Sequence, residues 1–239
     1  MATSTDRSLR DGLLRQQERV GDLLAQGGRR LGWKAGFGTA AAIEKLGTSG
    51  PLAAPLTDLT LEPSGASFDI SGWGKPVLEP EVALRLGADV EAGQSRAEVR
   101  AAVTAVGAAI ELVDLGEAGD DASAILAAGI FHRAVLLGEM VPLDSGASVA
   151  EVRIDVLSGG EEHAVAADPA ALLGDLLAVL AAMAELLAPI DDGLRAGDVI
   201  ITGAAVKPFE LVGGEAVAVR VGPSEVSARI DAPVLAIGR

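Results

Sequence analysis

Short apolar segments separated by glycines constrain the fold of this 239-residue chain more than any other feature. Such segments, bounded by turn residues, are typical of β-strands. They predict strands at residues 31–38, 67–72, 77–86, 109–116, 131–139, 151–162, 198–203, 215–222 and 225–230. Because helices do not alternate regularly with these strands, the pattern favours a mixed α+β fold rich in β-structure over a doubly wound sheet.

Spacing and capping residues predict the helices. They are expected at residues 6–26, 40–46, 95–109 and 169–187. Thr39 and Asp168 are suitable N-caps, and Ser95 with Glu98 forms a capping-box pattern. Residues 117–130 stay ambiguous. No repeat or composition break divides the chain, so we predict one domain, with a helical N-terminal segment at 1–50 and a β-rich catalytic part at 51–239.

The charge and the missing cysteines exclude several classes of function. A formal charge of -15 argues against nucleic-acid binding, which needs clustered Lys and Arg. Without cysteine there are no disulfides, zinc thiolate sites or iron–sulfur clusters. We expect a cytoplasmic protein without a membrane span, since the N-terminus has no uninterrupted apolar region and Asp175 and Glu185 interrupt the apolar stretch at 170–190.

Glu79, Pro80 and Glu81 form the most informative short motif. Residues two apart in a strand point to the same face, so both carboxylates project together. Pro80 favours an edge or irregular strand. A strand–helix–strand unit could then bring Glu111 beside the pair. Three carboxylates suit Mg²⁺ or Mn²⁺, which prefer oxygen ligands. A solvated acidic face is the alternative.

Four further residues are candidates for the site. Lys34 lies in a glycine-flanked apolar strand, where it either extends to solvent or faces an anion. Thr202 and Gly203 end an apolar strand and offer a hydroxyl and a backbone N–H to a ligand, or form a plain turn. His132 is either functional or a hydrogen-bonded strand residue. The second histidine, His163, is expected at the surface.

Four segments occur in the order seen in the fumarylacetoacetate hydrolase superfamily. They read GWKAGFG from Gly32, EPEVALRLG from Glu79, AIELVDLG from Ala109 and LRAGDVIITGA from Leu194. The chain most resembles the 2-oxopent-4-enoate hydratase and oxalocrotonate decarboxylase branch. The resemblance implies a mixed, twisted β-roll of the fumarylacetoacetate hydrolase C-terminal type, with flanking helices and an N-terminal helical segment.

The resemblance also assigns roles to individual residues. Glu79, Glu81 and Glu111 match the metal-binding carboxylates, and Lys34 and Asp114 match catalytic positions. Substrate-binding positions fall on Thr202 and Gly203, and we add His132 to them. The family assembles as homo-oligomers, and a partner enzyme of the same pathway, in aromatic catabolism, is a further expectation.

A metal-bound 2-oxo or enol acid can undergo three related reactions. Our first expectation is hydration of a 2-hydroxy-2,4-dienoate to a 4-hydroxy-2-oxo acid. Decarboxylation of a 2-oxo-3-enedioate such as 4-oxalocrotonate, or C–C hydrolysis of an acylpyruvate, is the alternative. The chain has Leu115-Gly116 where hydratases usually have Ser-Arg, and their Ala-Asp-Asn segment is absent. A non-catalytic, metal-binding partner subunit is therefore an alternative from a different class of function. The His-Glu pair of related hydrolases is not located, although Glu44 could be half of it.

Overall fold

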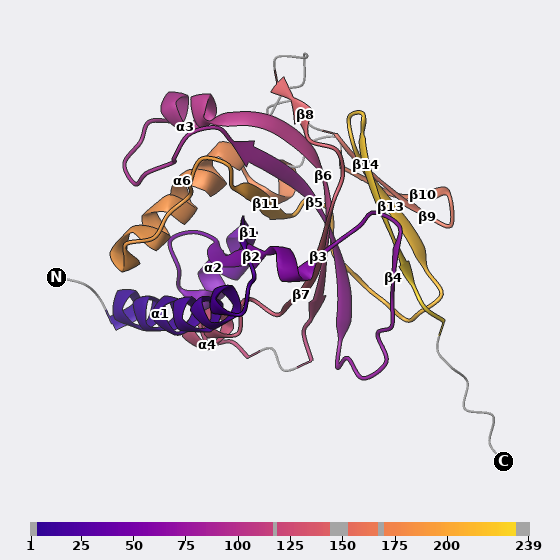
Figure 1. Cartoon of the computed structure of the whole chain (residues 1–239), viewed down its shortest axis with the longest axis horizontal. Helices are drawn as coiled ribbons and strands as arrows, with labels where there is room; N and C mark the ends of the chain where they lie inside the picture. Colours follow the sequence, from indigo (N-terminus) through magenta and orange to yellow (C-terminus); the bar gives the residue numbers. More distant parts are fainter. Residues whose placement is uncertain (1–3, 117–118, 144–152, 167–169, 233–239) are drawn as a thin grey trace.

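A computed structural model describes residues 4–116, 119–143, 153–166 and 170–232, whose strands form two sheets (Figure 1). The larger, nine-stranded sheet has the order β2-β1-β11-β5-β6-β7-β3, with β12 paired to β5 and β8 paired to β6. Its strands are β1 Arg30–Gly36, β2 Leu52–Thr57, β3 Leu61–Glu62, β5 Pro76–Leu86, β6 Val103–Asp114, β7 His132–Leu137, β8 Val141–Pro142, β11 Val199–Ala204 and β12 Phe209–Glu210. Since β1 pairs parallel with β11 and antiparallel with β2, the sheet is mixed.

The smaller sheet has five strands in the order β10-β9-β13-β14-β4. They are β4 Ala66–Phe68, β9 Ile154–Ser158, β10 Glu161–Ala166, β13 Ala216–Val221 and β14 Ser224–Ile230. Figure 1 shows this sheet against one side of the larger one, with the helices on the other side. The predicted strand at 67–72 is wrong in its second half, where the side chain of Asp69 accepts a hydrogen bond from the backbone N–H of Ser71 and turns the chain.

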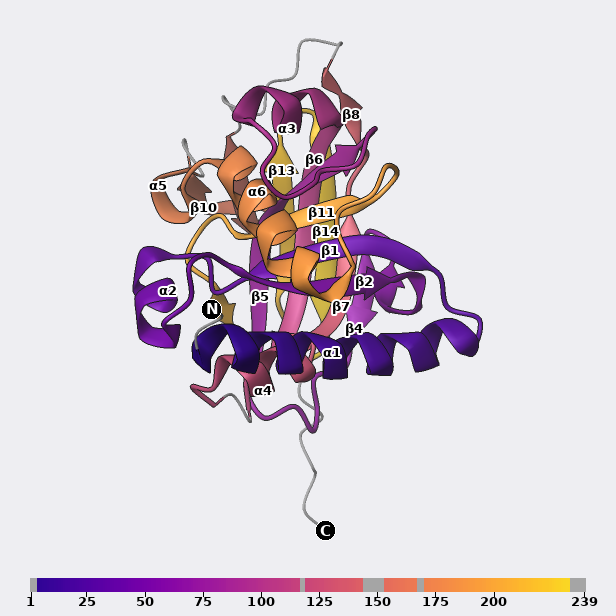
Figure 2. The same ribbon diagram turned by 90° about the vertical axis from the view of Figure 1, so that its left-hand side faces the viewer.

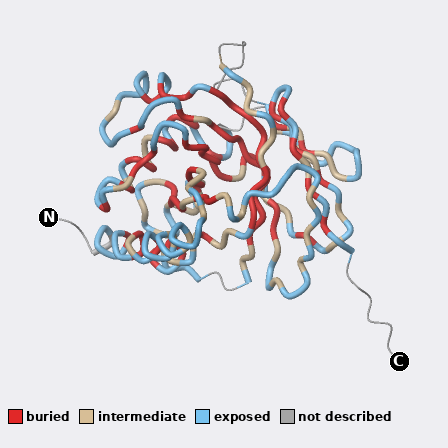
Figure 3. The backbone as a smooth tube through the Cα atoms, in the orientation of Figure 1, coloured by how far each residue is buried: buried red, intermediate tan, exposed pale blue. Residues whose placement is uncertain are grey.

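The helices cover the face of the large sheet that faces away from the small one (Figure 2). They are α1 Ser4–Ala25, α2 Ala40–Leu46, α3 Arg96–Ala102, α4 Ala122–Ala127, α5 Ala170–Leu173 and α6 Leu176–Leu187, with short 3₁₀ turns η1 Asp58–Thr60 and η3 Ala188–Ile190. Buried residues concentrate along the central strands (Figure 3). The mixed α+β roll with flanking helices is thus confirmed.

The hairpin of β5 and β6 replaces part of a predicted helix. We expected residues 95–109 to be helical, but α3 ends at Ala102 and β6 begins at Val103. Residues 103–114 pair with β5 over its whole length, so sheet pairing overrides the helix propensity of this alanine-rich segment. The two strands are therefore antiparallel neighbours, and α3 lies in the connection between them, so the predicted strand–helix–strand unit is confirmed.

Pro80 lies in a central strand, so the predicted edge position is wrong. Its strand, β5, is flanked by β11 and β6. The irregularity lies in β11, whose register shifts between Ile201 and Ala204 opposite Glu81. The Pro80 carbonyl accepts a hydrogen bond from Ala205 across this bulge. The bulge therefore occurs where proline has no N–H to give to the ladder.

The predicted helix at 169–187 is two helices. Its proposed start at Asp168 and Pro169 lies outside the described residues, and Gly174 interrupts it with a φ of 77°, in the left-handed region. Asp175 instead caps α6 through the backbone N–H of Leu177. The stretch Ala171–Ile190 is long and apolar enough by composition to cross a membrane, but seven side chains of α6 are buried in the protein, as in a core helix.

Candidate metal centre

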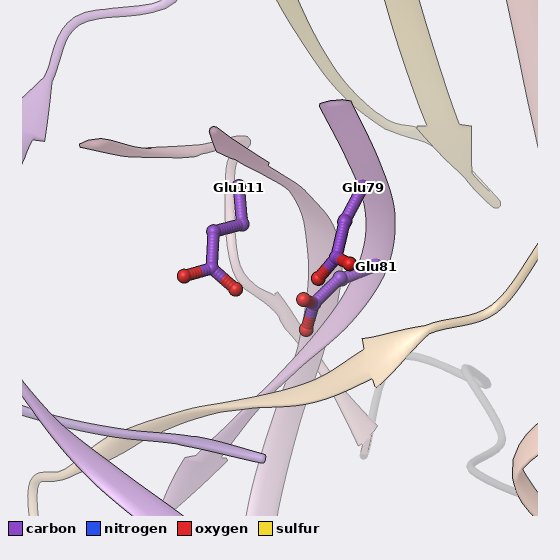
Figure 4. A group of neighbouring side chains, drawn as sticks. All are labelled: Glu79, Glu81 and Glu111. Atoms are coloured by element: carbon purple, nitrogen blue, oxygen red, sulfur yellow. The ribbon is translucent and has the colours of Figure 1, made fainter. Parts of the chain in front are cut away.

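Three glutamates from two neighbouring strands meet on one face of the large sheet (Figure 4). Glu79 and Glu81 are two residues apart on β5, and Glu111 on β6 is the direct cross-strand partner of Glu79. One carboxylate oxygen from each lies within 4.8 Å of the other two. Glu81 and Glu111 are fully buried, whereas Glu79 is partly exposed. The same-face arrangement predicted from the spacing is confirmed, and a solvated acidic face is excluded.

The hydrogen bonds leave one oxygen of each buried glutamate free. Glu81 Oε2 accepts from the backbone N–H of Gly203 at 2.7 Å, and Glu111 Oε1 accepts from two side chains. Glu81 Oε1 and Glu111 Oε2 are two of only four buried side-chain polar atoms in the described part of the chain that have no partner. A buried carboxylate oxygen without a donor is unfavourable, so this cluster fits a hard cation bound by oxygen ligands.

Lys34 is buried against the cluster and does not reach solvent. Its ammonium group donates to Glu111 Oε1 and, at 3.0 Å, to the carbonyl of Ile130. Between β1, which carries Lys34, and β6 lie β11 and β5. At about 4.8 Å per strand a flat sheet would keep the two side chains apart, so their contact requires the sheet to curl.

His132 is the second donor to Glu111. Its Nδ1 lies 2.7 Å from Glu111 Oε1, and its Nε2 lies 2.8 Å from Thr60 Oγ1. Because a carboxylate only accepts, Nδ1 carries the proton in this contact. His132 thus orients Glu111 together with Lys34, leaving Oε2 to face the cluster. Its predicted contact with substrate is not visible in this arrangement and stays a prediction.

Burial and mutual repulsion raise the pKa of two of the three glutamates. Burial and the negative charge of Glu111 raise the pKa of Glu79 to about 7. The same two causes raise the pKa of Glu81 well above its ordinary value. Burial also acts on Glu111, but the Lys34 charge and the His132 hydrogen bond outweigh it and hold the pKa of Glu111 below its ordinary value. Without a cation, the cluster therefore keeps protons near neutral pH.

We expect divalent-cation affinity to rise with pH across neutrality. Ligand carboxylates must be ionised, and the raised pKa values of Glu79 and Glu81 mean that protons compete with the cation at and below pH 7. Affinity should rise about tenfold per pH unit for each proton released. Titration calorimetry with Mg²⁺ between pH 6 and 8, in buffers of different ionisation enthalpy, counts these protons. An affinity independent of pH over this range would contradict the raised pKa values.

The Thr202-Gly203 turn contributes mainly through its backbone. The hydroxyl of Thr202 is buried and donates to the carbonyl of Val82 at 3.1 Å. Gly203 has a φ of 93°, which favours glycine, and the bulge frees its N–H for Glu81. Gly203 and Ala204 line the adjacent cavity. The turn therefore supports the glutamates and forms part of the cavity wall, while the predicted role of the Thr202 hydroxyl in substrate binding stays a prediction.

The structure does not bring Asp114 to the glutamate cluster. Its carboxylate accepts from the backbone N–H groups of Lys75, Gly116 and Gly74, and from Arg133 at 3.1 Å. The Lys75 hydrogen bond leads the causes that lower the pKa of Asp114. Three residues from Glu111 along β6, its side chain faces the other side of the sheet. These contacts anchor a loop, and the catalytic role of Asp114 stays a prediction.

Two other candidate residues lie away from the cluster. His163 is exposed on β10, as expected for a surface residue, although it lies in a strand and its ring is 5.1 Å from that of Phe209. Glu44 is exposed on α2 and is not among the residues that line the cavity.

Sequence reasoning missed a strained segment beside the cluster. Ile130 and Phe131 have φ values of 53° and 60°, which non-glycine residues rarely adopt. Their conformation presents the Ile130 carbonyl to Lys34 and places both residues in the cavity wall. Strained backbone of this kind recurs at functional sites. Only Gly129, directly before them, marks this turn in the sequence.

Comparisons with known proteins agree with this geometry. No protein-family model matches the chain. A 4-oxalocrotonate decarboxylase from a Pseudomonas species is 29% identical over 189 residues, which are 79% of this chain and 73% of that protein. The solved structure of 4-oxalocrotonate decarboxylase from Pseudomonas putida G7, with magnesium and adipate, is 27% identical with a TM-score of 0.81, covering 90% of this chain and 83% of that one. Fumarylpyruvate hydrolase from Pseudomonas aeruginosa, with Mn²⁺ and pyruvate, shares the fold at 16% identity, a TM-score of 0.63 and coverage of 86% and 90%.

Fold and site together define an enzyme whose rolled mixed sheet carries a buried carboxylate cluster suited to a divalent cation. These comparisons confirm the resemblance to the fumarylacetoacetate hydrolase superfamily, and to its branch of 2-oxopent-4-enoate hydratases and oxalocrotonate decarboxylases.

Proposed function

We propose that this protein is a divalent-metal-dependent decarboxylase of a 2-oxo-3-enedioate. The observation that carries the proposal is the pair of buried, unpartnered oxygens on Glu81 and Glu111 beside a largely apolar cavity. The similarity to 4-oxalocrotonate decarboxylase supports decarboxylation over hydration, our first expectation from the sequence.

Glu79, Glu81 and Glu111 would hold Mg²⁺ or Mn²⁺. When bound, such a cation supplies electrostatic stabilisation of negative charge on the 2-oxo oxygen of the substrate. Two side chains of the protein, Lys34 and His132, support the cation and the 2-oxo oxygen at this position. The Lys34 ammonium lines the cavity and adds a fixed positive charge, while His132 and Lys34 keep Glu111 ionised and oriented.

The reaction needs no electron donor or acceptor beyond the substrate. The bond between the far methylene carbon and its carboxylate breaks, and carbon dioxide leaves. The electron pair moves through the conjugated chain to the 2-oxo oxygen, which takes up one proton to give a 2-hydroxy-2,4-dienoate. The apolar walls, including Phe37, Val113 and Leu173, favour this step because they exclude water and stabilise a carboxylate less than the neutral gas.

The test compares two substrates with metal-stripped protein, with and without added Mg²⁺. Release of carbon dioxide from 2-oxo-3-hexenedioate only with metal is the expected result. Gain of one water by 2-hydroxypenta-2,4-dienoate, seen by mass, would replace decarboxylation with hydration. A second carboxylic acid formed from an acylpyruvate would indicate C–C hydrolysis. Metal binding without any turnover would identify a non-catalytic partner subunit and overturn the proposal.

We also propose that the protein works in the cytoplasm as a homo-oligomer, alone or with an enzyme of the same pathway. Size-exclusion chromatography with light scattering measures the size of the homo-oligomer. Co-purification with a hydratase of the branch tests the association with an enzyme of the same pathway.

A further inference from the structure

The cavity beside the glutamates is an apolar pocket of about 290 Å³. Its walls come from β1 and the segment after it, from β5, β6, α2 and α5, from the segment before β7, and from β11 and the segment after it. Its apolar lining includes Phe37, Val113, Leu115, Ile130, Phe131 and Leu173. A chain of several carbons fits such a wall, but a second carboxylate at its far end would need a partner of opposite charge.

Three charged side chains line this pocket in the described part of the chain: Lys34, Glu79 and Lys207. The ammonium group of Lys34 already donates hydrogen bonds to Glu111 and to the Ile130 carbonyl. Lys207 follows the Gly203-Ala204 wall by a few residues, is exposed, and forms no ion pair with any described residue. The pocket therefore has one cation that forms no ion pair within the described part of the chain.

Charge balance at the inner end leaves no other cation for a second carboxylate. The three ionised glutamates are neutralised by Lys34 together with a divalent cation, and no arginine is among the described residues that line the pocket. The carboxylate next to the 2-oxo group would lie directly against the bound cation and so has a partner at the inner end. A dicarboxylate brings a second negative charge to a mostly apolar wall, where an unpaired charge is unfavourable.

We propose that Lys207 determines specificity for linear dicarboxylates by pairing with the carboxylate farthest from the glutamates. The inference rests on the proposed function, because it takes the 2-oxo acid end of the ligand to lie at Glu79, Glu81 and Glu111. The inference goes further by naming the residue that makes the protein bind a 2-oxo diacid more tightly than a 2-oxo monoacid of equal length.

The chemistry predicts an unusual division between binding and rate. In decarboxylation the far carboxylate loses its charge as carbon dioxide forms, so the attraction of Lys207 is stronger in the bound substrate than in the transition state. Lys207 therefore aids binding and does not accelerate the bond cleavage. Lys207→Met should raise KM for the enedioate about fivefold, as for an exposed ion pair, and leave kcat unchanged or slightly higher.

The deciding experiment measures binding by calorimetry to the Mg²⁺-loaded protein. The ligands are 2-oxoadipate and 2-oxohexanoate, which share the 2-oxo acid end and differ only in the far carboxylate. The native protein should prefer the diacid. Lys207→Met should weaken 2-oxoadipate about fivefold without affecting 2-oxohexanoate, and Lys207→Arg should retain the preference.

Lys45→Met is the matched control, since it removes the same charge from nearby α2 but outside the pocket wall, where Lys45 pairs with Asp120. It should change neither affinity. If the native protein binds both ligands equally, or Lys207→Met weakens both to the same extent, this inference is overturned and the proposed function stands. If the Mg²⁺-loaded protein binds neither ligand, the proposed function fails and this inference fails with it.

Discussion

A Glu81→Gln variant should lose about a thousandfold or more in kcat/KM, because it removes a buried charged ligand from the proposed metal centre. Gln has nearly the shape of Glu and can still accept the Gly203 hydrogen bond that Glu81 Oε2 accepts in the structure. Changes to groups that merely support metal ligands lower affinity about 10–100-fold, so removal of a ligand charge should lower Mg²⁺ affinity at least about a hundredfold. Steady-state kinetics and calorimetry measure the two losses separately.

Thermal unfolding distinguishes a lost ligand from a damaged fold. Because burial raises the pKa of Glu81, its ionisation destabilises the metal-free protein, and this loss of stability grows as pH rises through the folded-state pKa. At pH 8 the metal-free Glu81→Gln protein should therefore unfold at the same or a higher temperature than the native protein. Mg²⁺ should raise the Tm of the native protein and have little effect on the variant.

Glu139→Gln provides the control for this comparison, because Glu139 is exposed and lies outside the cluster and the pocket wall. It should behave as the native protein in every assay. Full turnover by Glu81→Gln, or an undiminished rise of its Tm with Mg²⁺, would show that the three glutamates are not the metal centre.

The glutamate cluster could be predicted from the sequence because its geometry is mostly local. Two residues apart on a strand, Glu79 and Glu81 must share a face whatever the fold. The position of Glu111 depended on pairing between two strands, and the family resemblance supplied it. The predicted strand–helix–strand unit is confirmed, because α3 lies between β5 and β6 along the chain and the two strands are adjacent in the sheet.

The errors fell where pairing in three dimensions outweighs local preference. Residues 103–109 favour a helix by composition but form a central strand, and Gly174 divides a helix whose apolar run continues through it. The Lys34–Glu111 contact is of the same kind. It depends on the curvature of the sheet across four strands. The spacing of apolar residues along a single strand does not predict that curvature.

Removal of Lys34 should have the second large effect, and it should act on stability as well as activity. Both Lys34 and Glu111 are almost completely buried, and Lys34→Met leaves His132 as the only described residue that donates to the Glu111 carboxylate. Breaking a buried ion pair on one side destabilises a protein by about 3–5 kcal/mol. We expect denaturant unfolding of the metal-free variant to show a loss of this size, and kcat to fall about a thousandfold.

A double variant reveals whether the destabilisation comes from the unpaired charge of the Glu111 carboxylate. Lys34→Met with Glu111→Gln removes both charges, so it should recover most of the stability lost in Lys34→Met while remaining inactive. Mg²⁺ should stabilise Lys34→Met, whose three glutamates are intact, without restoring turnover, because the cation does not replace the ammonium group that lines the cavity. Restored turnover with metal would limit Lys34 to a structural role. Unchanged instability in the double variant would mean that lost packing of the Lys34 side chain, and not the charge of Glu111, destabilises the sheet.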